Sequence, residues 1–150
     1  MPQINPDQQA LHRWLADPSQ LPTFAANPMA SAMGTLLLAL DSAGATIRLQ
    51  FAPEGVFLQG AGVLQGGAVT AMLDFAMAFV VLAVLPAGHS CTTAEVKVSF
   101  LRAAPHGRYI ASAELMRRGR QLAFTRASLT PADDPERLVA SATSTLAILT

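Results

Sequence analysis

The sequence predicts an α+β fold in which an antiparallel sheet packs on one long helix. The first observation is the run 66–85, which is almost entirely apolar and has helical length. The second is a set of shorter segments with β-like alternation, two before this run and four after it. The third is that short, turn-rich links join these segments, as suits antiparallel neighbours. At 150 residues, the chain is expected to form one domain over 1–150.

Residues 1–33 are predicted to form a helix followed by a loop that covers the core. Residues 5–7 (Asn-Pro-Asp) supply a helix N-cap, a proline at the first helical position and an acid in the first turn. Apolar residues then recur at helical spacing until 17–18 (Asp-Pro) ends the pattern. Three prolines among small polar residues indicate a loop over 18–33, and 34–150 form the core of the domain.

The expected strands flank the long helix in the order β-β-α-β-β-β-β. Alternation is clearest after the helix, where Val96, Val98 and Phe100 alternate with polar residues. Residues 105–107 (Pro-His-Gly) and 118–120 (Arg-Gly-Arg) are typical of hairpin links. The predicted strands are 35–40, 45–51, 92–102, 108–117, 121–130 and 137–149.

The long helix is expected to be buried in a soluble protein, although its length approaches that of a membrane span. Asp74 lies near its middle, where a carboxylate is costly in lipid, and no Lys or Arg flanks the run. The whole chain is 51% hydrophobic and 13% charged, so part of its apolar surface is expected to face another subunit. The formal net charge of +0 gives no indication of a nucleic-acid or membrane partner.

Several classes of site are disfavoured by what the sequence lacks. The single cysteine, Cys91, rules out an internal disulfide and fits a reducing cytoplasm, and the first residues do not resemble a secretory signal. A glycine pattern at 60–66 misses the dinucleotide fingerprint, and neither a nucleophile elbow nor a Walker loop is present. His12, His89 and His106 do not pair at metal-ligand spacing, so neither a metal nor a separate cofactor is expected.

Two features of the long helix carry candidate chemistry. Gly66 and Gly67 at its start can present bare backbone N–H groups to a carbonyl oxygen that becomes negative during a reaction. The alternative is that these glycines only permit a tight entry into the helix. Asp74 favours the functional interpretation, because a buried carboxylate without a partner is seldom kept for packing. Its alternative is a structural aspartate hydrogen-bonded to the backbone of a neighbouring element.

The spacing of these two features constrains how they could cooperate. Gly67 and Asp74 are seven residues apart, so in one helix they are separated by about 10 Å along the axis. One reacting carbon cannot lie within about 3 Å of both groups. If both act on one substrate they must belong to different chains, and a shared site therefore predicts an obligate homodimer.

The stretch 65–74 (Gln-Gly-Gly-Ala-Val-Thr-Ala-Met-Leu-Asp), followed by 92–102 (Thr-Thr-Ala-Glu-Val-Lys-Val-Ser-Phe-Leu-Arg), resembles the hot-dog-fold acyl-CoA thioesterases of the phenylacetate-degradation, or PaaI-like, type. The family pattern has His-Gly-Gly, an acid seven residues after the second glycine, and Thr or Ser at the start of the next strand. The hairpin at 118–120 and the segment 138–140 (Leu-Val-Ala) also match, so the resemblance extends over about 34–149.

The resemblance implies a hot-dog fold, in which an antiparallel sheet wraps a central helix and two subunits form two sites at their interface, often within tetramers. It implies that the Gly67 N–H polarises the thioester carbonyl and that Asp74 of the partner subunit is the nucleophile or the general base toward water. Thr93 would position Asp74 or the water. Coenzyme A would enter as part of the substrate.

Two positions depart from the family pattern. Gln65 stands in place of the usual histidine, and Gln59 in place of an asparagine six residues earlier. Both are candidate site residues that can hydrogen-bond but cannot carry a proton at neutral pH. A hot-dog protein that binds an acyl thioester or a fatty or aromatic acid without turnover is therefore the competing hypothesis. Phe79 stands where hot-dog hydratases have a histidine, which disfavours hydration chemistry.

Arginines are the expected contacts for the phosphates of coenzyme A, because a guanidinium binds phosphate through several donors at once. The alternative is that these side chains belong to a solvated hairpin. The candidates are Arg102, Arg117, Arg118 and Arg120.

Overall fold

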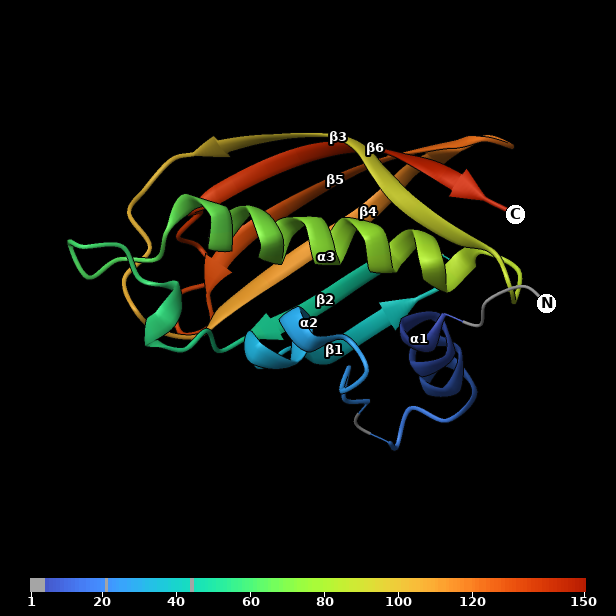
Figure 1. Ribbon diagram of the computed structural model, residues 1–150, viewed down its shortest axis with the longest axis horizontal. Coiled ribbons are helices and arrows are strands. Elements are labelled where there is room, and N and C mark those ends of the chain that lie inside the picture. Colours follow the sequence, from blue (N-terminus) through green and yellow to red (C-terminus); the bar gives the residue numbers. More distant parts are fainter. Residues whose placement is uncertain (1–4, 21, 44) are drawn as a thin grey trace.

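The computed structural model describes residues 5–20, 22–43 and 45–150, and it shows a six-stranded antiparallel sheet wrapped around a long helix (Figure 1). The strand order across the sheet is β1-β2-β4-β5-β6-β3. The predicted α+β class, an antiparallel sheet on one long helix with an extra N-terminal helix, is confirmed. The elements are α1 (Pro6–Ala16), α2 (Pro28–Ala32), β1 (Leu36–Asp41), β2 (Thr46–Phe51), a 3-10 helix (Gly55–Phe57), α3 (Gly66–Val84), β3 (Ser90–Phe100), β4 (Tyr109–Arg118), β5 (Leu122–Pro131) and β6 (Ala140–Leu149).

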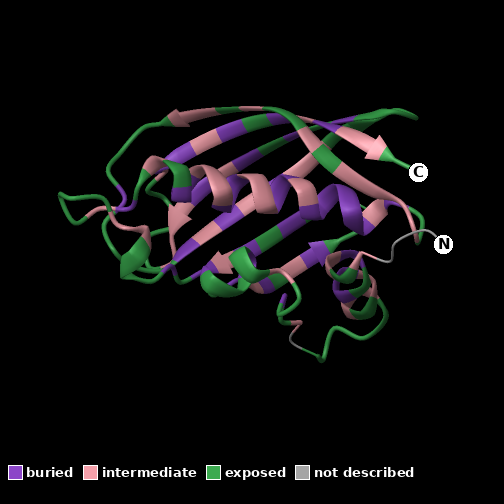
Figure 2. Cartoon of the chain, in the orientation of Figure 1, coloured by how far each residue is buried: buried purple, intermediate pink, exposed green. Residues whose placement is uncertain are grey.

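The helix α3 forms the centre of the hydrophobic core, and this explains its apolar composition. It contacts every strand from β2 to β6. Its 19 residues and mean hydropathy of 2.1 would suffice to cross a membrane, yet 61% of its most apolar window is buried inside the protein. Figure 2 shows these buried positions repeating along the helix where it faces the sheet. Burial against the sheet therefore accounts for the hydropathy.

The strand β3 forms one edge of the sheet. It pairs with β6 from Ser90, opposite Leu149, to Phe100, opposite Ala140. Within the described residues its other side has no partner strand, so an 11-residue row of backbone groups is open. An edge of this length is a ready template for pairing with another strand. The edge lies beside the part of α3 that carries Asp74, as described below.

The helix α1 supports the C-terminal end of α3 through one buried glutamine. The side chain of Asn5 caps α1, as predicted, by accepting hydrogen bonds from two backbone N–H groups of the first turn. Gln8 is only 3% exposed, and its amide nitrogen donates to three backbone carbonyls at the C-terminal end of α3. These acceptors, at 3.1 to 3.3 Å, are the backbone oxygens of Leu82, Leu85 and Pro86.

Replacing Gln8 by methionine is expected to lower the free energy of unfolding by about 2–3 kcal/mol, because the Leu85 carbonyl loses its donor and the Gly88 N–H its acceptor while the side-chain volume is nearly kept. Urea denaturation measures the change. Gln9→Met, on the exposed side of the same helix, is expected to stay within about 0.5 kcal/mol of wild type. Equal losses in both variants would contradict the role of the buried amide.

The structure differs from the sequence prediction in the N-terminal region. The stretch predicted as a covering loop contains the short helix α2, which Asn27 caps by accepting a hydrogen bond from the Ala30 N–H at 3.1 Å. The strands begin and end within three residues of their predicted bounds. Residues 1–4, on which the signal prediction rests, and residues 21 and 44 lie outside the described residues.

Candidate active site

The start of α3 presents backbone N–H groups that the helix does not use. The N–H groups of Ala68 and Val69 both donate to the carbonyl oxygen of Gln65. Within the described part of the chain, the Gly67 N–H donates to no other group. A Cβ built on Gly67 would meet nothing within 4 Å, whereas one on Gly66 would touch the Phe100 ring at 3.4 Å. The Gly67 amide is thus bare and accessible.

Asp74 is held by a side chain from the edge strand. It is half-buried, and its Oδ1 accepts a hydrogen bond of 2.8 Å from the Thr93 hydroxyl of β3. The resemblance implied that Thr93 lies beside Asp74, and this contact is observed. The alternative, an aspartate hydrogen-bonded to the backbone of a neighbouring element, is not seen in the described residues. The second carboxylate oxygen makes no hydrogen bond within the described residues, so it is open to water or substrate.

Gly67 and Asp74 lie on the same face of α3. The incompletely buried residues Gly67, Thr70, Asp74 and Ala78 follow one another at spacings of three or four, so they form one stripe along the helix. The Cys91 thiol of β3 lies 3.7 Å from the Ala78 carbonyl, which shows that the stripe borders the edge strand. This face is the part of α3 that the sheet of a single chain leaves uncovered.

A groove of about 390 Å³ lies beside the N-terminus of α3. It is lined by Gln59, Gly66, Phe100 and Arg102, among others, so it brings three parts of the predicted site together. The Gln59 side chain accepts a hydrogen bond of 2.7 Å from the Ala61 N–H and shapes the preceding turn. Gln65 is exposed, and its side chain does not cap the helix. It is therefore free to reorient toward a bound molecule.

The four predicted arginines do not gather at one place in a single chain. Arg102 lies at the groove and donates to the Leu138 carbonyl at 2.7 Å. Arg118 lies at the opposite end of α3, where it donates to the Val84 carbonyl at 2.9 Å. The two ends of this helix are about 27 Å apart. Arg117 and Arg120 are exposed and lie with Arg118 near the turn between β4 and β5.

An aromatic cluster adjoins the stripe. Phe75, next to Asp74 in the chain, has its ring centroid 5.6 Å from that of Phe79 and 6.4 Å from that of Phe51. The Phe24 ring lies 4.6 Å from Phe79. Phe51 was not singled out by the sequence analysis, because it lies on β2 and nothing in its local pattern links it to α3. Within the described residues, no group of three His, Cys, Asp or Glu side chains could hold a metal ion.

The Cys91 thiol is expected to be nearly unreactive in the folded protein. Burial, and to a lesser degree the nearby Asp74 carboxylate, raise its pKa from 9.0 to about 12. The thiolate is the reactive form, so alkylation by iodoacetamide should accelerate through about pH 12 in the native protein and through about pH 9 in urea. Because the folded protein favours the neutral thiol, the raised pKa stabilises the fold below about pH 9. This stabilisation is lost as the pH rises from 9.0 to about 12. Equal alkylation rates at about pH 8 in the native protein and in urea would contradict a raised pKa for Cys91.

The fold and the site together define a hot-dog protein with a carboxylate on its central helix. The chain belongs to the thioesterase superfamily, whose family model matches residues 61–138. It is of the PaaI-like type within that superfamily, on its similarity to the phenylacetic acid degradation-related protein described next.

Solved structures extend the similarity over most of the chain. A phenylacetic acid degradation-related protein of Ralstonia eutropha JMP134 is 33% identical with a TM-score of 0.79, over 92% of this chain and 98% of that one. A thioesterase family protein of Silicibacter pomeroyi is 27% identical with a TM-score of 0.78, over the same shares. The E. coli PaaI protein, at 16% identity, shares the fold with a TM-score of 0.75, over 97% of this chain and 94% of that one. No curated protein sequence matches the chain significantly.

Proposed function

We propose that the protein is an acyl-CoA thioesterase, which hydrolyses an acyl or aryl-acyl thioester to a free acid and coenzyme A. The observation that carries the proposal is the Asp74 carboxylate, held by Thr93 on the same uncovered face of α3 as the bare Gly67 amide. Membership in the thioesterase superfamily supports hydrolysis of a thioester in general. The Ralstonia relative is related to phenylacetic acid degradation, which favours an aryl-acyl group.

The proposed active site lies between two copies of the chain. Within α3, Gly67 and Asp74 are about 10 Å apart along the axis, too far to act on one carbonyl. A two-fold axis beside the open β3 edge would bring two α3 helices together in opposite directions through their uncovered stripes. Gly67 would then meet Asp74 of the partner subunit, and each dimer would hold two sites. Dimers would pair into tetramers, as the resemblance implies.

The proposed reaction breaks the thioester C–S bond. The Gly67 N–H stabilises the carbonyl oxygen as it gains negative charge. Asp74 of the partner subunit either takes a proton from the attacking water or attacks the carbonyl carbon to give an anhydride that water then cleaves. The coenzyme A thiolate leaves with the bonding electrons, and the water oxygen ends in the free acid. A thiolate needs little protonation, so Gln65 and Gln59 need only orient water or the leaving thiol by hydrogen bonds.

An antiparallel pair of α3 helices also suggests how separated arginines could share one coenzyme A. If Gly67 and Asp74 of the partner subunit lie level, the C-terminal end of the partner helix extends about 15 Å beyond Gly67. Arg118 of the partner subunit would then approach the groove that holds Arg102 from the other side. Arg117 and Arg120 of the same hairpin would supply further phosphate contacts.

Thr93 is expected to act as a positioning residue for Asp74. Thr93→Val keeps the side-chain shape but removes the donor, and it should lower kcat about 10- to 100-fold with little change in KM. Thr93→Ser retains the hydroxyl and should recover most of the rate. Steady-state kinetics on the three proteins measures both parameters. An equal loss in the serine variant would assign Thr93 a packing role instead.

A screen of thiol release from short, medium, long and aryl acyl-CoAs tests the proposed function. Hydrolysis of at least one class is expected, and the half-buried Cys91 thiol, with its raised pKa, should contribute little background. The specific feature that favours the alternative, binding without turnover, is Gln65, which cannot transfer a proton at neutral pH. Thermal stabilisation by acyl-CoA without thiol release from any class would establish binding without turnover and overturn the proposed thioesterase activity.

A further inference from the structure

We propose that Phe24, which lies in the segment before the sheet, is a positioning residue that limits the length of the acyl group at the proposed active site. This inference rests on the proposed function and adds to it a part of the chain that the catalytic groups do not include. Phe24 ends a row of aromatic rings, here called the aromatic row, that begins beside Asp74. The row consists of Phe75, Phe79 and Phe24 in that order, with Phe51 on the other side of Phe75.

The aromatic row starts at the edge of the uncovered stripe of α3. Phe75 follows Asp74 directly and is half-buried, so it borders the surface that a second subunit would cover. Phe79 lies about one helical turn further along α3, and its ring centroid is 5.6 Å from that of Phe75. An acyl group whose carbonyl carbon lies beside Asp74 would therefore meet the Phe75 ring next.

Phe24 closes the far end of the aromatic row. Its ring centroid lies 4.6 Å from that of Phe79, and the two residues are 3% and 2% exposed. Rings packed this closely leave no space for a further chain, so Phe79 cannot turn away from Phe75 while Phe24 is in place. A long acyl chain would have to push Phe79 into the space that Phe24 occupies.

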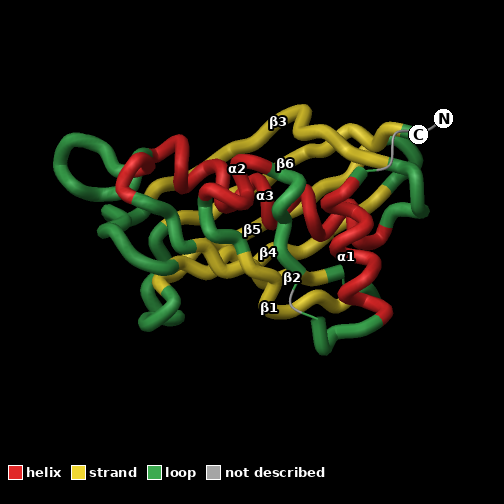
Figure 3. Tube along the Cα trace, turned by 60° about the horizontal axis from the view of Figure 1, so that its bottom comes forward, coloured by secondary structure: helices red, strands yellow, loops and turns green. Residues whose placement is uncertain are grey.

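Hydrogen bonds fix Phe24 beside α3, although it belongs to no helix and no named strand. The preceding residue, Thr23, pairs with Leu36 of β1 as an isolated antiparallel bridge. The Phe24 carbonyl accepts a hydrogen bond of 3.0 Å from the Asn27 N–H, and the Asn27 side chain donates to Asp7 of α1 at 2.8 Å. Figure 3 shows the segment between α1 and α2 on the side of the sheet that holds α3. These contacts make Phe24 a fixed wall.

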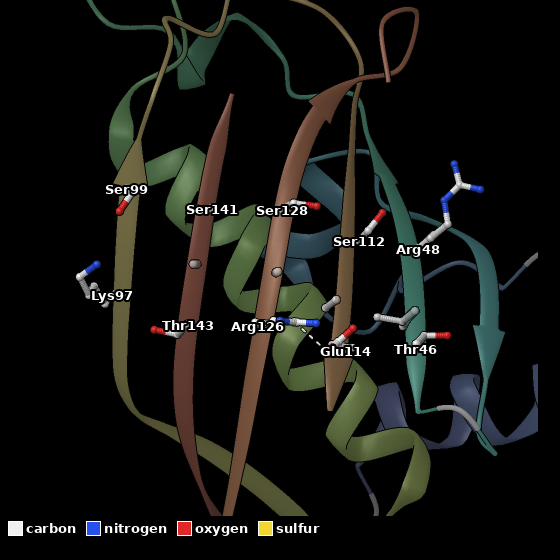
Figure 4. A pocket seen from close by; sticks show the side chains of 14 residues that line it. Thr46, Arg48, Lys97, Ser99, Ser112, Glu114, Arg126, Ser128, Ser141 and Thr143 are labelled. Atoms are coloured by element: carbon white, nitrogen blue, oxygen red, sulfur yellow. Dashed lines mark ion pairs between the residues drawn. The ribbon is translucent and has the colours of Figure 1, made fainter. Parts of the chain in front are cut away.

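The sheet closes a second side of this space. Phe51 is fully buried on β2, with its ring centroid 6.4 Å from that of Phe75. The polar side chains of the sheet, such as Ser112 and Arg48, lie on its opposite face (Figure 4). An acyl group beside Phe75 is thus confined between the sheet and the aromatic row. This space suits a compact acyl group, and an aryl ring gains offset stacking on Phe75.

Calorimetric titration with phenylacetyl-CoA, hexanoyl-CoA and dodecanoyl-CoA tests the proposal in the Asp74→Asn background, where turnover does not disturb binding. With Phe24 in place, phenylacetyl-CoA should bind about tenfold or more tightly than dodecanoyl-CoA. Phe24→Ala should raise the affinity for dodecanoyl-CoA about tenfold, so that the preference disappears. Phe24→Leu should shift the preference in the same direction by a smaller factor, and it carries the test if the alanine variant does not fold. In proteins that keep Asp74, kcat/KM for the three thioesters should follow the same order.

Leu11→Ala is the matched control, because it also truncates a fully buried side chain of the N-terminal region but lies on α1, outside the aromatic row. It should lower the melting temperature and leave the acyl preference unchanged. An unchanged preference in folded Phe24 variants would overturn the role of Phe24 and leave the proposed thioesterase activity intact. The same shift in Leu11→Ala, or tighter binding of dodecanoyl-CoA with Phe24 in place, would also overturn it. If no acyl-CoA is bound or hydrolysed, the proposed function fails and this inference fails with it.

Discussion

The Asp74→Asn variant is expected to lose about 10³-fold or more of kcat for thioester hydrolysis, because the amide can neither attack the carbonyl nor take a proton from water. The substitution is nearly isosteric, and the asparagine oxygen can still accept the hydrogen bond from Thr93. The fold and the binding of acyl-CoA should therefore be retained. Steady-state thiol release and a thermal melt measure the two properties.

A second half-buried carboxylate provides the matched control. Asp7 of α1 accepts a hydrogen bond of 2.8 Å from the Asn27 side chain, and burial raises its pKa. Asp7→Asn makes the same chemical change in a similar environment, far along the chain from the uncovered stripe of α3. It should keep the wild-type rate. Comparable losses in both variants would show that the effect of Asp74→Asn is a loss of folded protein.

Removing the Gly67 N–H is expected to reduce kcat about 10²- to 10³-fold, the usual loss when one oxyanion donor is deleted. Gly67→Pro makes this deletion. Proline is tolerated in the first turn of a helix, where the N–H has no intrahelical acceptor, and the Gly67 amide makes no hydrogen bond within the described residues. The variant should fold while losing its contact with the thioester oxygen.

Gly67→Ala separates the amide from the glycine itself. An added Cβ meets nothing within 4 Å, and the N–H is kept, so activity should remain within about tenfold of wild type. If the alanine and proline variants lose the same amount of activity, position 67 requires the small size of glycine and not its N–H. If neither variant loses activity, the oxyanion role of Gly67 is wrong.

The local parts of the fold could be predicted because their signals lie in neighbouring residues. The cap at Asn5 and the start of α3 at Gly66 each depend on a few consecutive positions, and both are confirmed. The helix α2 was missed because Pro28 is equally typical of a loop and of a first helical position, and five residues show no periodicity.

Contacts between distant parts of the chain could not be obtained in the same way. Gln8 reads as an ordinary polar residue of an amphipathic helix, and only the packing of α1 on the end of α3 shows that its amide is buried. The alignment of serines across the outer face of the sheet is a second example. Alternation predicts that Ser128 and Ser141 face away from the core, but their alignment depends on the strand order and register.

The residues of the candidate site could be predicted from the sequence, but their arrangement in space could not. The family resemblance pointed to Gly67, Asp74 and Thr93, and the structure shows two of these, Asp74 and Thr93, in direct contact. It separates Arg102 from Arg118 at opposite ends of α3, which residue spacing could not reveal. The roles of these residues remain proposals, because they depend on how a second subunit covers the stripe.

Mixing two inactive variants tests most directly whether each site takes Gly67 from one subunit and Asp74 from the other. Asp74→Asn and Gly67→Pro are co-expressed with different tags, and thiol release is measured on the purified mixed dimer and on each parent. In a mixed dimer, one site has both native groups and the other has neither. The account predicts that the purified mixed dimer recovers about half of the wild-type rate, because one of its two sites is native, while each parent stays inactive. A mixture no more active than its parents would contradict a site shared between subunits.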